Sequence, residues 1–290
     1  MPTFAFVTVD VFTDKRFGGN PLAVFPDARG LSDADMQALA AEFNLSETTF
    51  VLPPPDPANT ARVRIFNRRS EMPFAGHPNV GTGWVLAGMG RAKNGMLRFE
   101  EIAGLVEVRT EGDQVTIAAP QPLSLGPEMP TELLAGCVGI APADVVTRHH
   151  RPVSASVGNS FVVAEVTGAA LTRATPDVAR FRQAIATYTA MGANRLPLYL
   201  YAHDGSRLRA RMFSPLSGTI EDAATGSAAT PLAALLLSFG QENEGRYEIV
   251  QGVEMGRPSR LLAAAKRGAD GIRATVGGGC VPVLKGEVSL

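Results

Sequence analysis

Two short segments of this sequence place a glycine and a polar residue where an apolar helix should begin. EMPFAGHPNVGTGWVLA runs from Glu71 to Ala87, and EDAATGSAATPLAALLL runs from Glu221 to Leu237. The first N–H groups of a helix have no partner within the helix and carry partial positive charge, so they can hold a carboxylate or an oxyanion. Glycine lets a ligand approach the backbone closely because it has no Cβ. Both segments are therefore candidate sites for a small anionic ligand.

Polar side chains beside these glycines could also contact a bound ligand. His77 follows Gly76, Ser227 follows Gly226, and Asp222 lies five residues before Ser227. An ordinary strand-to-helix turn with capping residues explains either segment taken alone, because helix caps are far commoner than ligand sites. Two such segments at equivalent places in one chain favour a functional site instead.

The two segments belong to a longer internal repeat. Their residues match at a constant offset of 150, as in Glu71 with Glu221. Upstream, GNPLAVF at residues 19–25 matches GNSFVVA at residues 158–164, and RVRIFNRRSE from Arg62 has a weaker match in RLRARMFSPLSGTIE from Arg207. Three matches in the same order predict two similar halves of about 120–140 residues, the size of single domains.

Each half has the same predicted order of elements, which indicates an α+β fold with two pseudo-symmetric domains. An alternating strand opens each half, a helix follows, and further strands flank the glycine-containing turn and its apolar helix. The first helix, residues 31–44, has Ser32 as a candidate N-cap with Asp35 three residues on, and its counterpart spans residues 175–192. Sites in such proteins usually lie in a cleft between the halves, and each copy of the motif would then supply one wall.

The domain boundaries follow from a proline-rich stretch. PQPLSLGPEMP, residues 120–130, is the predicted linker. It separates a first domain, residues 1–119, from a second domain, residues 131–277. The last strand, about residues 278–290, is expected to return to the first domain.

One carboxylate distinguishes the halves. At the offset of 150, Glu47 in NLSETTFV lies opposite Pro197 in NRLPLYLY. A lone glutamate is most often a solvated turn residue, but TTFVL predicts a buried strand directly after Glu47. A carboxylate at the edge of an apolar environment has a raised pKa, which suits proton transfer near neutral pH. Glu47 is therefore the candidate acid/base.

The composition excludes several classes of function. Formal net charge is −1, and the basic residues are scattered, so nucleic-acid binding is not expected. No secretory signal, membrane-spanning run or metal-ligand spacing is present, which predicts a cytoplasmic protein without a bound metal. His149 and His150 are expected on the surface, and His203 in a hairpin turn. Trp84 is expected in the core.

Five motifs in order resemble the phenazine-biosynthesis isomerase family, called PhzF-like, whose fold is shared with diaminopimelate epimerase. They cover nearly the whole chain: VDVFTDKRFGGNPLAVF, NLSETTFV, EMPFAGHPNVGTGWVL, EDAATGSAATPLAALL and QGVEMGRPSRL. The resemblance implies two domains, each a barrel-like sheet around a central helix, with the active site between them. It also implies a reaction without a cofactor, a small-molecule substrate and a homodimer.

The resemblance also implies roles for individual residues. By motif, Glu47 is similar to the family's catalytic acid/base, and His77, Asp222 and Ser227 resemble its supporting polar residues. The positions expected to hold the substrate are Asn20, Ser46, Gly76 and Gly226. Ala223 departs from the family pattern, which often has proline there, and this should change local stiffness rather than chemistry.

Three functions remain open at this point. Related epimerases use one cysteine thiol from each half, but here Cys137 and Cys280 lie outside both motifs. The single carboxylate favours a proton-shift isomerase that acts on a substrate similar to trans-2,3-dihydro-3-hydroxyanthranilate. The alternatives are a one-base racemase or epimerase of an amino acid, and a binding protein that has kept the pocket without the chemistry.

Overall fold

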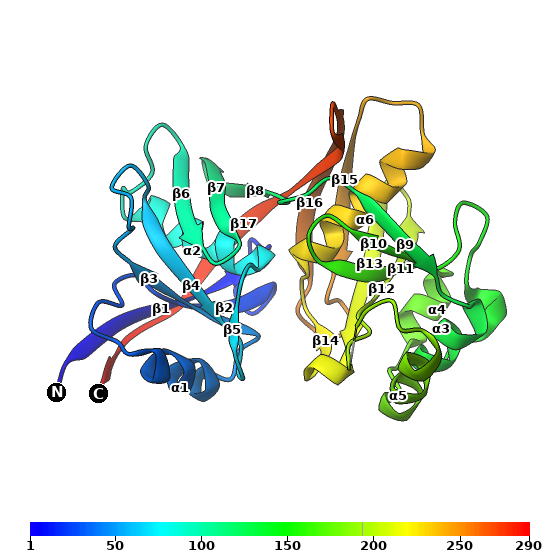
Figure 1. The fold of residues 1–290 in the computed structure, drawn as a ribbon, viewed down its shortest axis with the longest axis horizontal. Helices are drawn as coiled ribbons and strands as arrows, with labels where there is room; N and C mark the ends of the chain where they lie inside the picture. The colour runs from blue at the N-terminus through cyan, green and yellow to red at the C-terminus, as the bar shows by residue number, and fades with distance from the viewer. Residues whose placement is uncertain (193) are drawn as a thin grey trace. The chain divides into compact units, whose positions relative to one another are not determined.

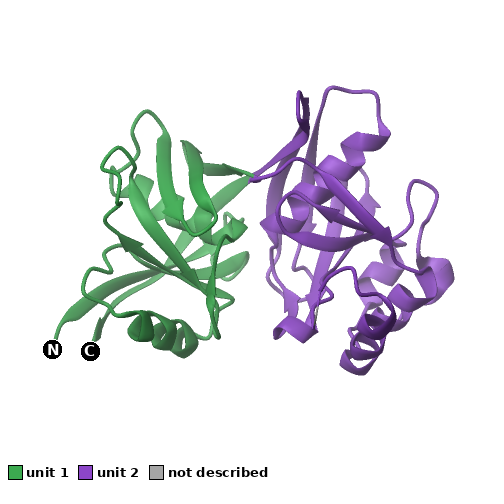
Figure 2. Ribbon diagram, in the orientation of Figure 1, with its two compact units in different colours: residues 1–118, 277–290 green, residues 119–276 purple. Residues whose placement is uncertain are grey.

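The chain folds into two compact units in a computed structural model that describes residues 1–192 and 194–290. Unit 1 comprises residues 1–118 and 277–290, and unit 2 comprises residues 119–276 (Figure 2). The sequence motifs therefore fall one in each unit, with residues 76–88 in unit 1 and residues 226–239 in unit 2.

The predicted linker is part of unit 2 rather than a free connection. Its residues include strand β9 (Ser124–Glu128), which pairs with β10 (Val153–Ser156). The register shifts between Val153 and Ala155, so β9 has one extra residue opposite this part of β10. This bulge accommodates Pro127, because a bulged position needs no ladder hydrogen bond.

Unit 1 is a closed barrel around one helix (Figure 1). Eight strands pair in succession, and the last pairs with the first. The pairs β2–β3 and β4–β6 are parallel. The helix α2 (Gly76–Gly88) contacts strands from around this barrel, namely β1, β2, β3, β7 and β8. In barrel order the strands are β1 (Thr3–Val11), β2 (Asn20–Phe25), β3 (Glu47–Leu52), β4 (Ala61–Phe66), β6 (Met96–Glu101), β7 (Gly104–Glu111), β8 (Gln114–Ala118) and β17 (Gly271–Ser289).

The strand order of unit 2 repeats that of unit 1, as the sequence predicts. The strand order is β9, β10, β11 (Ser160–Glu165), β12 (Leu198–Asp204), β13 (Arg207–Ser214), β15 (Glu244–Gln251) and β16 (Ser259–Gly268). The parallel pairs, β11–β12 and β13–β15, occupy the same places as in unit 1. Helix α6 (Gly226–Phe239) packs on β10, β11, β15 and β16. The short strands β5 (Glu71–Met72) and β14 (Thr219–Asp222) lead into α2 and α6.

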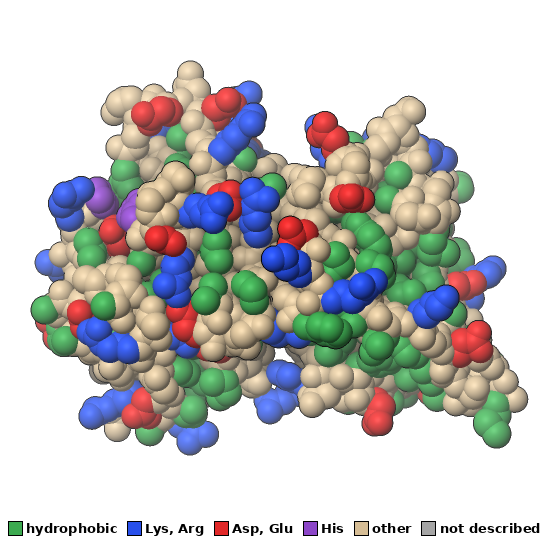
Figure 3. All heavy atoms as spheres, turned by 180° about the vertical axis from the view of Figure 1, so that it is seen from behind, with side chains coloured by type: hydrophobic (Ala, Val, Ile, Leu, Met, Phe, Trp, Pro, Cys, Tyr) green, Lys and Arg blue, Asp and Glu red, His purple; other side chains and the backbone are tan. Residues whose placement is uncertain are grey.

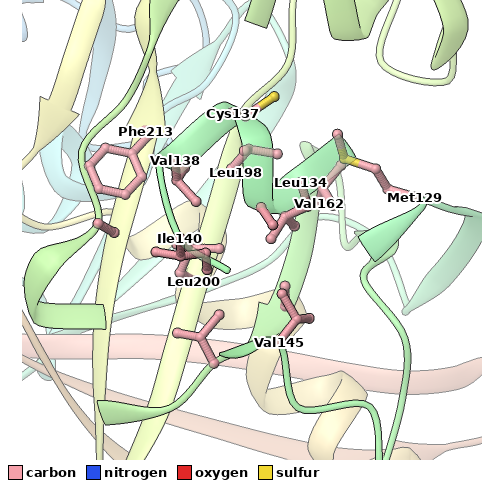
Figure 4. Packing of buried hydrophobic residues seen from close by; sticks show 14 of the residues in the cluster. Met129, Leu134, Cys137, Val138, Ile140, Val145, Val162, Leu198, Leu200 and Phe213 are labelled. Carbon is pink, nitrogen blue, oxygen red and sulfur yellow. The ribbon is translucent and has the colours of Figure 1, made fainter. Parts of the chain in front are cut away.

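The remaining helices lie outside the barrels and cover further cores. Helix α1 (Asp33–Phe43) begins at Ser32 with the predicted capping box to Asp35, and it encloses an aromatic cluster that includes Phe25 and Phe50. In unit 2, α3 (Thr131–Val138), α4 (Gly168–Arg173) and α5 (Val178–Thr187) cover a second cluster. Figure 4 shows part of this cluster, where side chains of α3 lie beside those of β11 and β12.

Helix α5 is shorter than the predicted helix at residues 175–192. Asp177 caps its start by accepting hydrogen bonds from the N–H groups of Ala179 and Arg180. It ends at Thr187 because the next residue, Tyr188, has non-helical backbone angles and a buried ring whose hydroxyl donates to Pro127 O at 2.8 Å.

The surface carries both signs of charge, and acidic and basic side chains are interspersed on the face in Figure 3. Trp84 of α2 is half-buried. His203 is the next-to-last residue of β12 and pairs with Leu208, so it lies in the strand just before the hairpin turn at Gly205 rather than in the turn itself. Within residues 1–192 and 194–290, no helix has the length and apolar character that crossing a membrane requires.

Helix α2 fits inside its barrel because two of its residues have no side chain. A Cβ at Gly83 would lie 2.6 Å from Val108 Cγ1 and 3.2 Å from Val115 Cγ1. A Cβ at Gly81 would lie 2.6 Å from Leu22 Cδ2. Contacts this short would force side chains of the barrel to move, so the barrel closes only around a helix with glycine at these positions.

Gly83→Ala should therefore destabilise the protein by about 1–3 kcal/mol through overpacking. Gly88→Ala is the matched control in the same helix, because a Cβ at that position would have no other atom within 4 Å. That control should be neutral or stabilising by up to about 1 kcal/mol, since alanine favours a helix over glycine. Denaturant unfolding of the two variants measures both values, and equal stabilities would contradict the tight packing of α2.

Candidate functional site

Three of the predicted site residues meet in unit 1. The Nδ1 atom of His77 lies 3.4 Å from Glu47 Oε2 and 3.5 Å from Asn20 Nδ2. Asn20 and His77 are buried, and the Glu47 side chain is 16% exposed. The structure thus brings together residues that are up to 57 positions apart in the sequence.

The fold positions each of these residues at the start of an element. Asn20 and Glu47 are the first residues of β2 and β3, which pair in parallel with Leu22 opposite Glu47. His77 is the second residue of α2, directly after Gly76. Ser46 precedes Glu47 in the chain and is half-buried. Strand register and the beginning of one helix therefore fix the cluster.

Burial keeps the His77 imidazole neutral. It lowers the pKa of His77 to about 3, far below its ordinary value. A neutral imidazole has one N–H donor and one acceptor nitrogen. Nδ1 faces Asn20 and Glu47, whereas Nε2 is buried without a hydrogen-bond partner among the described residues. Nε2 is therefore a polar atom that a bound molecule could satisfy.

The helices that carry the two motifs begin without a side-chain cap. Three other helices have one, supplied by Ser32, Thr167 and Asp177. At α2 the N-cap residue is Ala75, and at α6 it is Thr225, and neither side chain accepts from the helix N–H groups. Capping polar residues therefore do not explain the motifs, and the N–H groups at these two helix starts are suited to a carboxylate.

In unit 2 a hydrogen-bonded network fixes the turn before α6. Thr225 Oγ1 donates to Asp222 Oδ2 at 2.6 Å instead of capping the helix. Gln251 Nε2 donates to Asp222 O at 2.9 Å and to Thr225 Oγ1 at 3.0 Å. Gln251 Oε1 accepts from the Thr225 N–H and the Tyr199 hydroxyl, both at 3.2 Å. Asp222 is thus held at the end of β14, and Gly226 and the half-buried Ser227 follow at the start of α6.

The acid that opens each motif is structural. Glu71 forms a two-pronged ion pair with Arg64, with both N···O distances at 2.7 Å. Glu221 pairs in the same way with Arg211, with both distances at 2.8 Å. Arg64 lies over the ring of Phe66 and Arg211 over that of Phe213. The repeated glutamate therefore ties β5 to β4 and β14 to β13.

The residues that hold the turns were not predicted from the sequence. Gln251 and Ser259 lie in the QGVEMGRPSRL motif, for which no role was expected beyond the family resemblance. Ser259 Oγ donates to the carbonyl of Ala223 at 2.9 Å, which is where the family often has proline. The motif marked these residues as important, but only the strand pairing shows that they contact the turn before α6.

The prediction of two surface histidines holds for His149 and is wrong for His150. The His150 ring stacks on Tyr201 and Phe239, with centroids 5.8 and 5.6 Å apart, and its Nε2 lies 2.9 Å from the Tyr201 hydroxyl. Burial lowers the pKa of His150. A histidine in a loop was expected to be solvated, but this loop packs its ring against β12 and α6.

Neither cysteine belongs to a motif turn. Cys137 is in α3 and Cys280 is in the unit 1 part of β17, and both thiols are free and buried. Burial raises the pKa of each thiol to about 12, so both are protonated at neutral pH. No group of three or more potential metal-ligating side chains occurs among the residues described.

Comparison with known proteins gives the same assignment over the whole chain. A family model described as phenazine biosynthesis-like protein matches residues 9–286. A trans-2,3-dihydro-3-hydroxyanthranilate isomerase of Pseudomonas chlororaphis is 38% identical over an alignment of 296 positions, which covers 98% of this chain and 99% of that protein. An uncharacterized isomerase of Mesorhizobium japonicum is 37% identical over an alignment of 304 positions, with 99% of each chain covered.

A solved structure agrees in fold. The PhzF-family phenazine biosynthesis protein of Bacillus anthracis superposes with a TM-score of 0.89 at 24% identity, with both chains covered completely. The same family is indicated by the matched family model, by the full-length relatives and by the repeated fold of the two units. The chain belongs to the family of phenazine biosynthesis-like proteins and is a PhzF-type isomerase.

Proposed function

We propose that this isomerase shifts a proton on a small carboxylated ring substrate that carries an amine or a hydroxyl group, without a cofactor. Trans-2,3-dihydro-3-hydroxyanthranilate, on which the Pseudomonas chlororaphis relative acts by name, has this chemistry. The observation that carries the proposal is the contact of Glu47 with a neutral, buried His77 at the uncapped start of α2.

Glu47 performs the proton transfer in this proposal. Its carboxylate takes a proton from an sp³ carbon of the ring, so a C–H bond breaks and an O–H bond forms on Glu47. The two electrons of the C–H bond enter the conjugated system of the substrate. The Glu47 O–H bond then breaks and its proton goes to a second carbon, which leaves Glu47 ionised and the substrate isomerised. A positioned acid/base of this kind contributes about 10²–10⁴-fold to the rate.

The groups around Glu47 assist by orientation and electrostatics. The N–H groups at the start of α2 suit the substrate carboxylate, and their partial positive charge stabilises the electrons that enter the conjugated system. His77 remains neutral, so its Nε2 can exchange a hydrogen bond with the substrate while Nδ1 faces Glu47. The supporting roles of Asp222 and Ser227 stay predictions from the motifs, and orientation of the substrate supplies much of the remaining rate enhancement.

A mechanism with two thiols has little support. It requires a thiolate from each motif turn, whereas Cys137 lies in α3 and Cys280 in β17, and burial raises the pKa of each thiol to about 12. A one-base racemase would use the same Glu47, but it would return the proton to the carbon from which it came. The position of deuterium in the product separates these two reactions.

Glu47→Gln should leave folding intact and lower turnover of trans-2,3-dihydro-3-hydroxyanthranilate by at least about 10²-fold, because the amide cannot accept the proton. In D₂O the proton held on Glu47 exchanges with solvent before it is delivered, so the wild type should place deuterium on a carbon that was sp² in the substrate. Glu42→Gln, at an exposed position of α1, is the control and should keep wild-type turnover. A Glu47→Gln variant within a few-fold of the wild-type rate would refute the role of Glu47. Deuterium only at the original carbon, with inversion there, would instead indicate a racemase.

The His77 imidazole should stay neutral from pH 5 to pH 8. Because burial lowers the pKa of His77 to about 3, its protonation cannot produce a limb in the pH–rate profile near neutral pH. NMR of ¹⁵N-labelled histidine, with a His77→Asn sample to assign the signal, tests this expectation. Chemical shifts of the assigned ring that move with a midpoint between pH 5 and pH 8 would contradict it.

A further inference from the structure

The turn before each motif helix needs a buried side chain that holds it. In unit 2 this side chain is Gln251, the last residue of β15, which is fully buried. Its amide reaches both ends of the turn, Asp222 and Thr225, and Thr225 is the N-cap of α6. The start of α6 is therefore fixed by a neutral group that donates and accepts hydrogen bonds.

Strand register places Glu101 at the equivalent position in unit 1. β4 and β6 pair in parallel with Arg62 opposite Glu100, and β13 and β15 pair in parallel with Arg209 opposite Val250. The residue that follows Glu100 in β6 is Glu101, and the residue that follows Val250 in β15 is Gln251. Each is the last residue of its strand. The two positions are also 150 apart, which is the offset of the motif repeat.

Glu101 lies beside the turn that begins α2. The N–H of Ala103, two residues on, donates to Pro73 O within that turn at 3.1 Å. The amide of Asn79, in the first turns of α2, is close enough to act on the Glu101 carboxyl group. Asn79 Nδ2 in turn donates to the carbonyl of Ala75, the N-cap of α2, at 3.1 Å.

The polar atoms at this contact are unsatisfied as long as Glu101 is ionised. Both Glu101 carboxylate oxygens and Asn79 Oδ1 are buried without a hydrogen-bond partner among the described residues. An acceptor-only carboxylate cannot donate to Asn79 Oδ1, whereas a protonated carboxyl group can. Burying an ion without a partner costs free energy of folding. A proton on Glu101 removes the buried charge and gives Asn79 Oδ1 a hydrogen-bond donor.

We propose that Glu101 is a positioning residue that, as a protonated acid, holds the start of α2 through Asn79 in the way that Gln251 holds the start of α6. The Glu101 O–H donates to Asn79 Oδ1, and Asn79 Nδ2 donates to Ala75 O. Residue 229, which corresponds to Asn79 at the offset of 150, is alanine, because Gln251 reaches the N-cap residue of α6 directly. Glu101 itself does not touch substrate in this role.

The electrostatics agree with a protonated Glu101. Burial raises the pKa of Glu101 to about 8, against a smaller opposite effect of the Asn79 amide. No ionised group contributes to this shift. The titratable groups on the neighbouring elements are His77 on α2, Arg62 and Arg64 on β4, Glu71 on β5, Arg98 and Glu100 on β6, and Glu107, Arg109 and Glu111 on β7.

The test is the pH dependence of stability, which does not rest on the proposed function. A carboxyl group whose pKa is raised on folding stabilises the protein below its unfolded pKa, and this stability is lost as pH rises to about 8. The wild type should therefore lose stability from pH 5 to pH 8.5, and Glu101→Gln should lose less. At pH 8.5 the variant should melt at least about 5 °C above the wild type. Glu107→Gln, on the neighbouring strand and 47% exposed, controls for the loss of a negative charge.

Two further measurements separate positioning from general stability. Hydrogen exchange of residues 72–80, corrected for the intrinsic effect of pH, should increase between pH 6 and pH 9 in the wild type and stay constant in Glu101→Gln. Gln251→Glu should add a second pH-dependent loss of stability and increase exchange in residues 222–230. Parallel pH profiles for wild type and Glu101→Gln, or a wild type that is the more stable at pH 8.5, would overturn the proposal.

Discussion

A helix enclosed by a closed barrel can present only its ends to a ligand. The sides of α2 are buried against strands on several sides, so closely that Gly81 and Gly83 leave no room for a Cβ. All N–H groups within the helix are bonded to carbonyl groups one turn earlier, and only those of the first turn have no partner in the helix. The candidate site therefore lies where this helix begins, and the strands that enclose the helix place Asn20 and Glu47 beside His77.

The two units share the same order of strands around a motif helix, and they differ at a few equivalent positions. The ion pairs of Arg64 with Glu71 and of Arg211 with Glu221 tie the strand before each helix to its barrel. Within this common frame, Glu47 corresponds to Pro197 in the repeat and His77 corresponds to Ser227. Unit 1 thus has the carboxylate and the imidazole. The proposed single acid/base, Glu47, matches a proton shift better than a reaction that needs an equivalent base in each unit.

Much of the architecture could be predicted from the sequence. The repeat at an offset of 150 identified two similar halves, and the Ser32 capping box fixed the start of α1. Contacts between distant residues could not be predicted in this way. Pro127 looked like part of a linker because the bulge that accommodates it exists only when β9 pairs with β10. Glu101 and Gln251 match at the repeat offset of 150, but they lie outside the two glycine-containing motifs, and the register of β6 beside β4 and of β15 beside β13 is what shows that they are structurally equivalent.

The most direct test of the proposed site is a crystal structure with 3-hydroxyanthranilate, an aromatic compound with the carboxylate, amine and hydroxyl groups of the proposed substrate but no acidic sp³ C–H. The ligand carboxylate should accept hydrogen bonds from N–H groups at the start of α2. A Glu47 carboxylate oxygen should lie within about 3.5 Å of one of the two ring carbons that are sp³ in the substrate. A ligand bound away from this helix start, or with Glu47 out of reach of the ring, would contradict the assignment.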